Sequence, residues 1–408
     1  DRSVSRGLGD VYKRQDVKTA KAALFPSLSF STSQQVVNRP YQETSSRVSG
    51  SEIISSNSKT SYNGNYGLNA SWTLYNGNKR LKTIQQEKLN NQVAELDVAT
   101  SENNIQESIA QVYIQILYAA ESVKVNESTL QVSIAQRDRG QELLNAGSIA
   151  KSDFAQLEAQ VSTDRYQLVT AQATLEDYKL QLKQLLELDG ENEMNIYLPA
   201  LSDENVLAPL PTKKDVYIRA LSLRPEIEAS KLNVEASELG IGIAKSSYLP
   251  TISLSAGIGT NHTSGSDFTF GEQVKNGWNN SIGLSVSVPI FNNRQTKSAV
   301  QKAKLQYETS MLSLLDEQKT LYKTIEGLWL DANSAQQRYA AANEKLKSTQ
   351  ISYELISEQF NLGMKNTIEL LTEKNNLLQA QQEQLQAKYM AILNMQLLKF
   401  YQGDQLAI

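Results

Sequence analysis

The side chains that usually carry out chemistry in proteins are scarce in this sequence. It has no cysteine and a single histidine, His262, within the polar segment TNHTSGSD. A metal site built on thiolates or imidazoles needs several such ligands, so we expect His262 to be a solvated loop residue. The glycines of GIG at 240–242 lie in a helical pattern and lack the strand–loop–helix context of a dinucleotide site. With no nucleophile paired to a base, the sequence predicts no enzyme activity, no metal site and no cofactor.

Composition and charge narrow the class of protein further. The chain has 408 residues, of which 40% are hydrophobic and 7% aromatic, and this is low for globular cores of that size. Its formal net charge of -4 leaves no basic stripe, so nucleic acid is not expected as a partner. No stretch approaches about 18 consecutive apolar residues, so no helix is predicted to span a membrane.

Two long proline-free blocks, 41–198 and 290–408, can hold very long helices. In the first block, apolar residues recur at intervals of three and four, as in a coiled-coil seam. The seam residues are Ile109, Val112, Ile116, Ala119 and Val123. We predict a helix over about 78–146, a stop near Gly147, and a return helix over about 149–187. The first helix would be roughly 100 Å long, far longer than the helices of globular proteins.

The same pattern occurs twice in the chain. Gly147 and Asp153 correspond to Gly363 and Glu369, in both cases 216 positions later. The segments AKAALFPSLSF and AKSSYLPTISL also correspond, with an offset of 224, so the first hairpin loop is eight residues longer. This indicates a tandem duplication of one structural unit. The helices predicted in the second unit are about 213–247, about 293–362 and about 365–402.

Each unit also contains two segments in which apolar residues alternate with small polar ones. The predicted strands are about 24–33, 66–75, 250–259 and 280–290. A soluble sandwich would bury the apolar face beneath a second sheet, but the rest of the chain is helix that is too polar to cover it. Four strands cannot close a membrane barrel, which needs about eight, so several chains must share one. Three copies would supply twelve strands around a lumen lined by Ser, Gly, Asn and Thr.

The predicted organisation has two repeats joined by an equatorial linker. The repeats are 16–188 and 213–403, the linker is 189–212, and 404–408 is a C-terminal tail. Residues 1–15 have neither an amphipathic pattern nor the order of a signal peptide, so we expect a foreign or mis-assembled segment. The authentic start, with an export signal and one helix, is then expected to be missing. Segment 34–60, rich in Ser, Asn and Thr, is predicted to be a long exposed loop.

All three tryptophans have predicted roles. Trp72 and Trp278 are candidates for aromatic residues of a membrane interface, and Trp278, just before the last strand, is the better candidate. Trp329 lies at helical spacing from Ile325 and is expected to pack between helices.

Three stretches, in this order and within a duplicated chain, resemble the TolC-like outer membrane efflux channels. They are AGSIAKSDFAQLEAQ (146–160), RPEIEASKLNVEASELGIGIAKSSYLPTISLSAG (224–257) and FNLGMKNTIELLTEKNNLLQAQ (360–381). The resemblance runs from about residue 16 to 403. It implies a mainly α fold with a small β part, in which two repeats of a strand pair and a long coiled-coil hairpin build a trimer. The trimer would form a twelve-stranded β-barrel continued by an α-helical barrel.

The resemblance also implies a location, partners and a function. The location is the outer membrane of a Gram-negative bacterium, where one end of the protein contacts outer membrane lipid. The rest forms a long part in the periplasm. The partners are two other copies of the chain, a periplasmic adaptor protein at the helix tips, and an inner membrane transporter that supplies the energy. The function is an exit duct for small molecules such as drugs, toxic compounds or metal ions, or for secreted proteins.

Pore residues at the helix tips are implied by the resemblance alone. Asp153 matches the family's tip aspartate, Lys365 lies where an arginine is usual, and Phe360 replaces a tyrosine. Glu369 matches the first carboxylate of a ring at the narrowest point, and Thr372 replaces the second. Because lysine lacks the forked contact of arginine and phenylalanine lacks a hydroxyl, we expect a looser closure than in the family. Three copies of Glu369 would favour cations.

A simpler interpretation stays open for the charged residues at the tips. A simpler interpretation also stays open for the turn residues beside them. Asp153, Lys365 and Glu369 could merely cap and solvate helix ends, since surface charges usually contribute little. The turns present small and apolar side chains that could dock the adaptor or could simply end two helices. The turn residues are Gly147, Ser148, Ile149, Ala150, Gly363 and Met364.

The alternative function is that of a soluble periplasmic coiled-coil adaptor or scaffold. An adaptor should show one helical hairpin flanked by β-domains with two-sided cores. This chain has two hairpins and strands with a single apolar face, so the channel is favoured.

Overall fold

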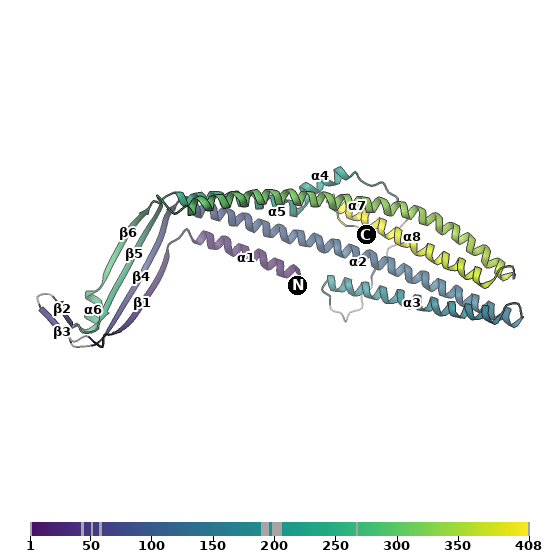
Figure 1. Ribbon diagram of the computed structural model, residues 1–408, viewed down its shortest axis with the longest axis horizontal. Coiled ribbons are helices and arrows are strands. Elements are labelled where there is room, and N and C mark those ends of the chain that lie inside the picture. The colour runs from purple at the N-terminus through teal and green to yellow at the C-terminus, as the bar shows by residue number, and fades with distance from the viewer. Residues whose placement is uncertain are drawn as a thin grey trace. The chain divides into compact units, whose positions relative to one another are not determined.

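The computed structural model describes residues 2–41, 45–49, 52–56, 59–188, 196–197, 206–266 and 268–406. Eight α-helices and one short 3-10 helix (Ser246–Tyr248) are described, together with six strands (Figure 1). The helices are α1 (Arg2–Ala22), α2 (Lys79–Asn145), α3 (Lys151–Leu185), α4 (Lys213–Leu223), α5 (Pro225–Lys245), α6 (Phe270–Asn276), α7 (Gln295–Asn361) and α8 (Thr367–Tyr401). Across the part of the chain that is described, no helix has both the length and the apolar content needed to cross a membrane.

The strands form one main sheet and one small hairpin. They are β1 (Ser27–Asn38), β2 (Ser45–Ser49), β3 (Glu52–Ser56), β4 (Thr60–Asn76), β5 (Thr251–Thr263) and β6 (Asn279–Ser287). The main sheet is antiparallel throughout, in the order β1-β4-β5-β6, and β2 pairs with β3. The two repeats therefore each contribute two strands to one sheet.

The chain divides into two compact units. One, here called the helical unit, contains Asp1–Arg6, Leu96–Glu228 and Leu315–Ile408. The other, here called the sheet unit, contains Gly7–Glu95 and Ala229–Leu314. Both long helices, α2 and α7, contribute residues to each unit.

The register of the sheet separates its two faces. Leu68 pairs with Phe30 on one side and Ile258 on the other, whereas Asn69 pairs with Ser29 and Gly257. Because side chains alternate along a strand, the first set shares one face and the second set shares the other. On the polar face, the amide of Asn69 donates to the hydroxyl of Ser31 at 3.4 Å. The alternation in the sequence thus produces one apolar face and one face of small polar side chains.

The apolar face of the sheet is largely uncovered in the sheet unit. Phe30 is 68% exposed and Ile282 is 77% exposed. Among the described residues of this unit, the buried hydrophobic side chains are only Ile84, Ala229 and Ala236, all of them on helices. The sheet therefore has no core of its own on that face.

The helical unit is held together by two clusters of buried side chains. The first joins α2, α7 and α8, with Ile114, Tyr339 and Leu397 among its members. The second packs α4 and the start of α5 onto α7 and α8, through residues such as Val216 and Ile325. Both clusters follow the seam spacing of the long helices, which is why polar helices can still pack.

Trp329 lies beside the second cluster. Its indole N–H donates to the carbonyl of Pro211 at 3.0 Å, and the Lys213 ammonium lies 4.7 Å from its ring centroid. Trp329 is partly buried against this cluster of residues from α4, α5, α7 and α8, so the expected packing between helices is confirmed.

The structure corrects two of the predicted elements. The predicted loop 34–60 is wrong, because β1 extends to Asn38, β4 begins at Thr60, and β2 and β3 lie between them. The single helix predicted over 213–247 is also wrong, because Arg224 has an extended backbone (ψ 124°) and Pro225 starts a new helix. A residue before proline is pushed out of the helical region, and proline cannot donate the next hydrogen bond.

The structure does not test two further expectations. The predicted linker 189–212 lies mostly outside the described residues. Helix α1 runs through position 15 without a break, and the foreign origin of residues 1–15 stays a prediction.

Candidate functional site at the helix tips

Each long helix ends in a turn closed by a glycine with positive φ. Gly147 has φ 71° and Gly363 has φ 74°, a region that other residues enter at a cost. In the second turn the backbone N–H of Met364 donates to the carbonyl of Gln359 at 2.8 Å, and the equivalent bond closes the first turn at the same length. The two turns lie at the same end of the helical unit (Figure 1). The repeated sequence thus gives two equivalent tips.

The candidate docking residues lie on the surface of these tips. Ser148, Ala150 and Gly363 are exposed, Ile149 is half-buried, and Met364 is 71% exposed. An exposed methionine on a turn is an adaptable apolar contact. Their role in binding an adaptor stays a prediction.

Glu369 is the best-held of the candidate pore residues. Its carboxylate accepts from the backbone N–H of Asn366 at 3.2 Å, and the Asn366 side chain accepts from the N–H of Glu369 at 2.9 Å. This reciprocal pair is a capping box at the start of α8. Lys365 donates to the other carboxylate oxygen at 2.6 Å. The hydrogen bond from Lys365, followed by that from Asn366, lowers the pKa of Glu369, so the carboxylate is ionised near neutral pH.

The remaining candidate pore residues make simpler contacts. Asp153 is half-buried and accepts from the backbone N–H of Ala150 at 3.3 Å, at the start of α3. Phe360 is only 3% exposed, so it packs inside the unit. Thr372 is exposed and donates to the carbonyl of Ile368 at 2.8 Å.

Of these five residues, the structure joins only Lys365 and Glu369. No hydrogen bond or ion pair between Asp153 and either Lys365 or Phe360 is present among the described residues. Within one chain, Asp153 and Glu369 cap helices, as the simpler interpretation has it. Their action in a pore formed by several chains stays a prediction.

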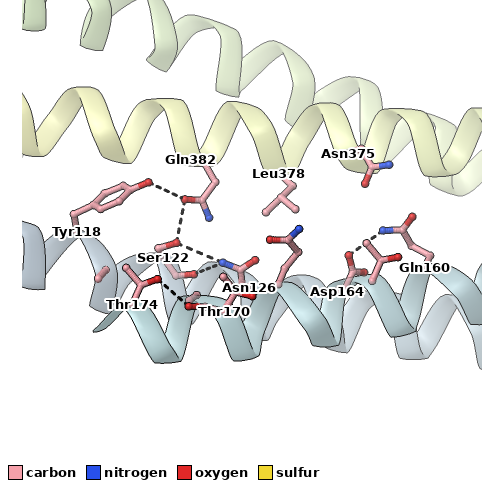
Figure 2. A pocket seen from close by; sticks show the side chains of 14 residues that line it. Tyr118, Ser122, Asn126, Gln160, Asp164, Thr170, Thr174, Asn375, Leu378 and Gln382 are labelled. Carbon is pink, nitrogen blue, oxygen red and sulfur yellow. Dashed lines mark hydrogen bonds between the residues drawn. The ribbon is translucent and has the colours of Figure 1, made fainter. Parts of the chain in front are cut away.

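A polar cavity of about 360 Å³ lies farther along the hairpins, between α2, α3 and α8 (Figure 2). On its α8 side, the Gln382 side chain accepts from the hydroxyls of Tyr118 (3.4 Å) and Ser122 (3.1 Å) of α2. The amide of Asn126 donates to the carbonyl of Ser122 at 2.8 Å. This wall therefore links the two hairpins of one chain through neutral hydrogen bonds.

A buried ion pair adjoins the same cavity through Asp164, which is one of the residues lining it. Lys374 of α8 and Asp164 of α3 are 3% and 2% exposed, and the ammonium contacts both the Asp164 carboxylate and the hydroxyl of Ser133 on α2. Ser133 also donates to Asp164, and Gln160 donates to the second carboxylate oxygen at 2.9 Å. Burial lowers the pKa of Lys374, and Asp164 partly opposes this. The pair ties three helices together at a point that sequence reasoning missed.

The sequence did contain a signal for the buried pair. Lys374 stands four residues after Leu370 and three before Leu377, both of which are buried. Asp164 likewise stands three residues after Val161, a buried position. A charge at a seam position of a coiled coil is expected to be buried. No cluster of three His, Asp or Glu side chains able to hold a metal ion occurs in the described ranges.

Comparison with known proteins decides the family. A family model described as outer membrane efflux protein matches residues 12–187 and 216–403. The chain belongs to the outer membrane efflux protein family. The predicted family, the mainly α fold of two repeats and the outer membrane location are thereby confirmed, and the alternative of a soluble adaptor is not supported.

Two curated relatives in this family share less than a quarter of their aligned residues with the chain. The outer membrane efflux protein BepC of Brucella suis biovar 1 (strain 1330) is 24% identical over 290 residues, which are 71% of this chain and 60% of BepC. The outer membrane protein TolC of Escherichia coli (strain K12) is 23% identical over 311 residues, or 74% of this chain and 62% of TolC. The chain thus spans about three fifths of the length of these relatives.

A solved structure shares the fold of this chain. The crystal structures of CusC are described in terms of conformational changes that accompany folding and transmembrane channel formation. CusC superposes on this chain with a TM-score of 0.82 at 19% sequence identity. The match covers 99% of this chain and 89% of CusC.

Proposed function

We propose that this chain is one subunit of a trimeric outer membrane channel through which small molecules or secreted proteins leave the cell. The observation that carries this proposal is the uncovered apolar face of the four-stranded sheet, opposite a face of Ser, Asn, Gly and Thr. Burying such a face in hydrocarbon stabilises it by about 25 cal/mol for each Å² removed from water, whereas the polar face requires water. Membership of the efflux protein family supports the same assignment.

The free edges of the sheet support assembly. In the described sheet, β1 and β6 each have a partner strand on one side only. An open edge at membrane depth leaves backbone groups without hydrogen bonds, which costs several kcal/mol for each group. Pairing β1 of one copy with β6 of the next would satisfy them, and three copies would close a ring of twelve strands.

The tips supply the proposed closed end and docking site. Glu369, three times around the axis, would set the charge at the narrowest point, with Lys365 beside it. The exposed turn residues, Met364 among them, would contact a periplasmic adaptor that connects the channel to an inner membrane transporter. The transporter would supply the energy.

Extraction from membranes tests the proposal. The channel should stay in the membrane fraction until detergent is added and should migrate as a trimer that heating converts to a monomer. Recovery of a folded monomer in the soluble fraction would rule the proposal out.

A further inference from the structure

The connection between β5 and β6 folds into the short helix α6, which is fastened to β5. The hydroxyl of Thr260 donates to the carbonyl of Val274 at 2.7 Å, and the backbone N–H of Thr263 donates to the Gln273 side chain at 2.8 Å. A capping box between Thr269 and Glu272 fixes the first turn of the helix. This segment therefore has a defined position on the sheet.

Aromatic contacts between the sheet and α6 also hold the helix in this position. The ring of His262 lies between Tyr66 and Phe270, with centroid distances of 5.9 Å and 5.1 Å. A Cβ atom on Gly64 would come within 2.1 Å of the His262 ring, so a glycine at this position leaves room for the stack. The predicted solvated loop histidine is instead a packed residue at the end of β5.

Helix α6 lies against the apolar face of the sheet only at one end of β5. Along β5, Thr260 and His262 follow Leu254 and Ile258 at even spacing, and no bulge interrupts β5 against β6. Residues at even spacing share a face. The side chains of Thr260 and His262, which contact α6, therefore lie on the face that carries Leu254 and Ile258. The chain reaches β5 from α5 at Thr251, so α6 lies at the end of the strand remote from that helix.

The outer surface of this segment is aromatic. Phe268 is 50% exposed, and Phe270 and Trp278 are each 57% exposed. The charged residues Glu272 and Lys275 are exposed between them. Aromatic side chains mixed with charges are typical of the boundary between hydrocarbon and lipid headgroups.

Strand length places α6 at this boundary if the apolar face contacts lipid. A tilted strand crosses the hydrocarbon in about 9–11 residues. Counted from Ile252, the first apolar residue of β5, that distance ends close to Thr260 to His262, where the contacts to α6 begin. The helix is therefore continuous with the apolar face and begins where hydrocarbon should end.

We infer that α6, with Phe268, Phe270 and Trp278, is an interfacial anchor that rests in the headgroup boundary of the outer leaflet. The partner is a lipid surface, not a second protein, because the anchor extends the face that the proposed function assigns to lipid. The inference rests on that proposed function.

Depth measurement with nitroxide labels tests the anchor. The chain has no cysteine, so single cysteines introduced by Phe268→Cys, Ile282→Cys and Lys319→Cys carry one label each without background. All three positions are exposed, so labelling should leave packing intact. The full chain is reconstituted in vesicles of phosphatidylethanolamine and phosphatidylglycerol. Collision rates with oxygen, which dissolves in hydrocarbon, and with a water-soluble nickel complex are then compared.

The anchor predicts an intermediate depth at position 268. Its label should meet the nickel complex severalfold less often than the label at 319 and severalfold more often than the label at 282. A label at 268 as accessible to nickel as that at 319 would overturn the inference, and so would one shielded from both reagents, which would indicate a protein partner. Water-like behaviour at 282 would instead overturn the proposed function.

Discussion

Lys374 and Asp164 show how much depends on single residues in this molecule. Removing two charges from water costs several kcal/mol for each ion, and the cost is repaid only when both stay together with their hydrogen bonds. Ser133 and Gln160 complete the set of partners. The pair therefore specifies how α3 and α8 align more than it adds to stability.

Lys374→Met should destabilise the helical unit by about 3–5 kcal/mol, because it leaves the Asp164 carboxylate buried without a cation. The double variant Lys374→Met/Asp164→Leu should regain most of the loss, since an apolar pair needs no counter-charge. Lys345→Met is the matched control, because it breaks the exposed pair with Glu383 and should cost less than about 1 kcal/mol. The measurement is the midpoint of unfolding, monitored by the far-UV circular dichroism signal of the helices. Equal losses in all three variants would contradict a buried-charge effect.

The ion selectivity of the proposed channel should change in opposite directions when Glu369 and Lys365 are each neutralised. Glu369→Gln leaves Lys365 uncompensated and should lower the preference for cations, whereas Lys365→Gln leaves Glu369 uncompensated and should raise it severalfold. Reversal potentials in planar bilayers under a salt gradient measure both. Glu383→Gln removes another glutamate of α8 that pairs with a lysine and serves as the control. Unchanged selectivity in both tip variants would remove these residues from the pore.

At the residue scale, the sequence could predict types of position but not partners. Lys374 stands at a seam position between Leu370 and Leu377, so its burial was open to prediction. Asp164 lies 210 residues away on another helix. Their meeting depends on the alignment of two hairpins, which local periodicity does not determine.

At the scale of elements, the break between α4 and α5 forms a joint around one buried arginine. Arg224 is 6% exposed, donates to Glu107 at 2.8 Å, and lies 3.6 Å from the ring centroid of Tyr401 at the end of α8. A planar guanidinium can stack and bind a carboxylate at once, which lysine cannot do. The joint therefore fastens the helix break to α2 and α8.

Tyr401 should make the joint sensitive to alkaline pH. Burial, and then the nearby Glu107, raise the pKa of Tyr401 to about 12. An unfolded tyrosine loses its proton near pH 10, so between pH 10 and about 12 the folded chain holds more protons and the free energy of unfolding falls. Tyr401→Phe should remove about 2 kcal/mol of that fall at pH 12. Melting temperatures from pH 9 to 12 measure it, with the exposed Tyr166→Phe as control, and identical slopes in both variants would contradict the assignment.

The elements themselves were largely predictable because their signals are local. Periods of two and of three to four, glycines at the turns and the 216-residue repeat lie in the sequence itself. The break at Arg224 was missed although Pro225 marks it, because the helical pattern continues on both sides. Helix α6 was missed because seven residues in a polar loop carry too little periodicity, and its position depends on contacts to β5.

At the scale of the whole molecule, assembly should follow from the unpaired edges of the sheet. Replacing Ile282 and Leu284 of β6 by proline would remove two backbone donors and should prevent the heat-sensitive trimer from forming in detergent. Ile282→Ala/Leu284→Ala is the control, because it keeps the backbone donors and should still assemble. Trimers of equal yield from the proline variant would exclude β6 as an assembly edge.

The most direct test concerns which face of the sheet meets water. Ser281 and Ile282 are neighbours on β6 that point to opposite faces, and a cysteine at either position would be the only thiol in the chain. In reconstituted vesicles, a charged, membrane-impermeant thiol reagent should label Ser281→Cys at least tenfold faster than Ile282→Cys, while a lipid-soluble maleimide should label both. Equal or reversed labelling by the charged reagent would show that the apolar face is not in the membrane.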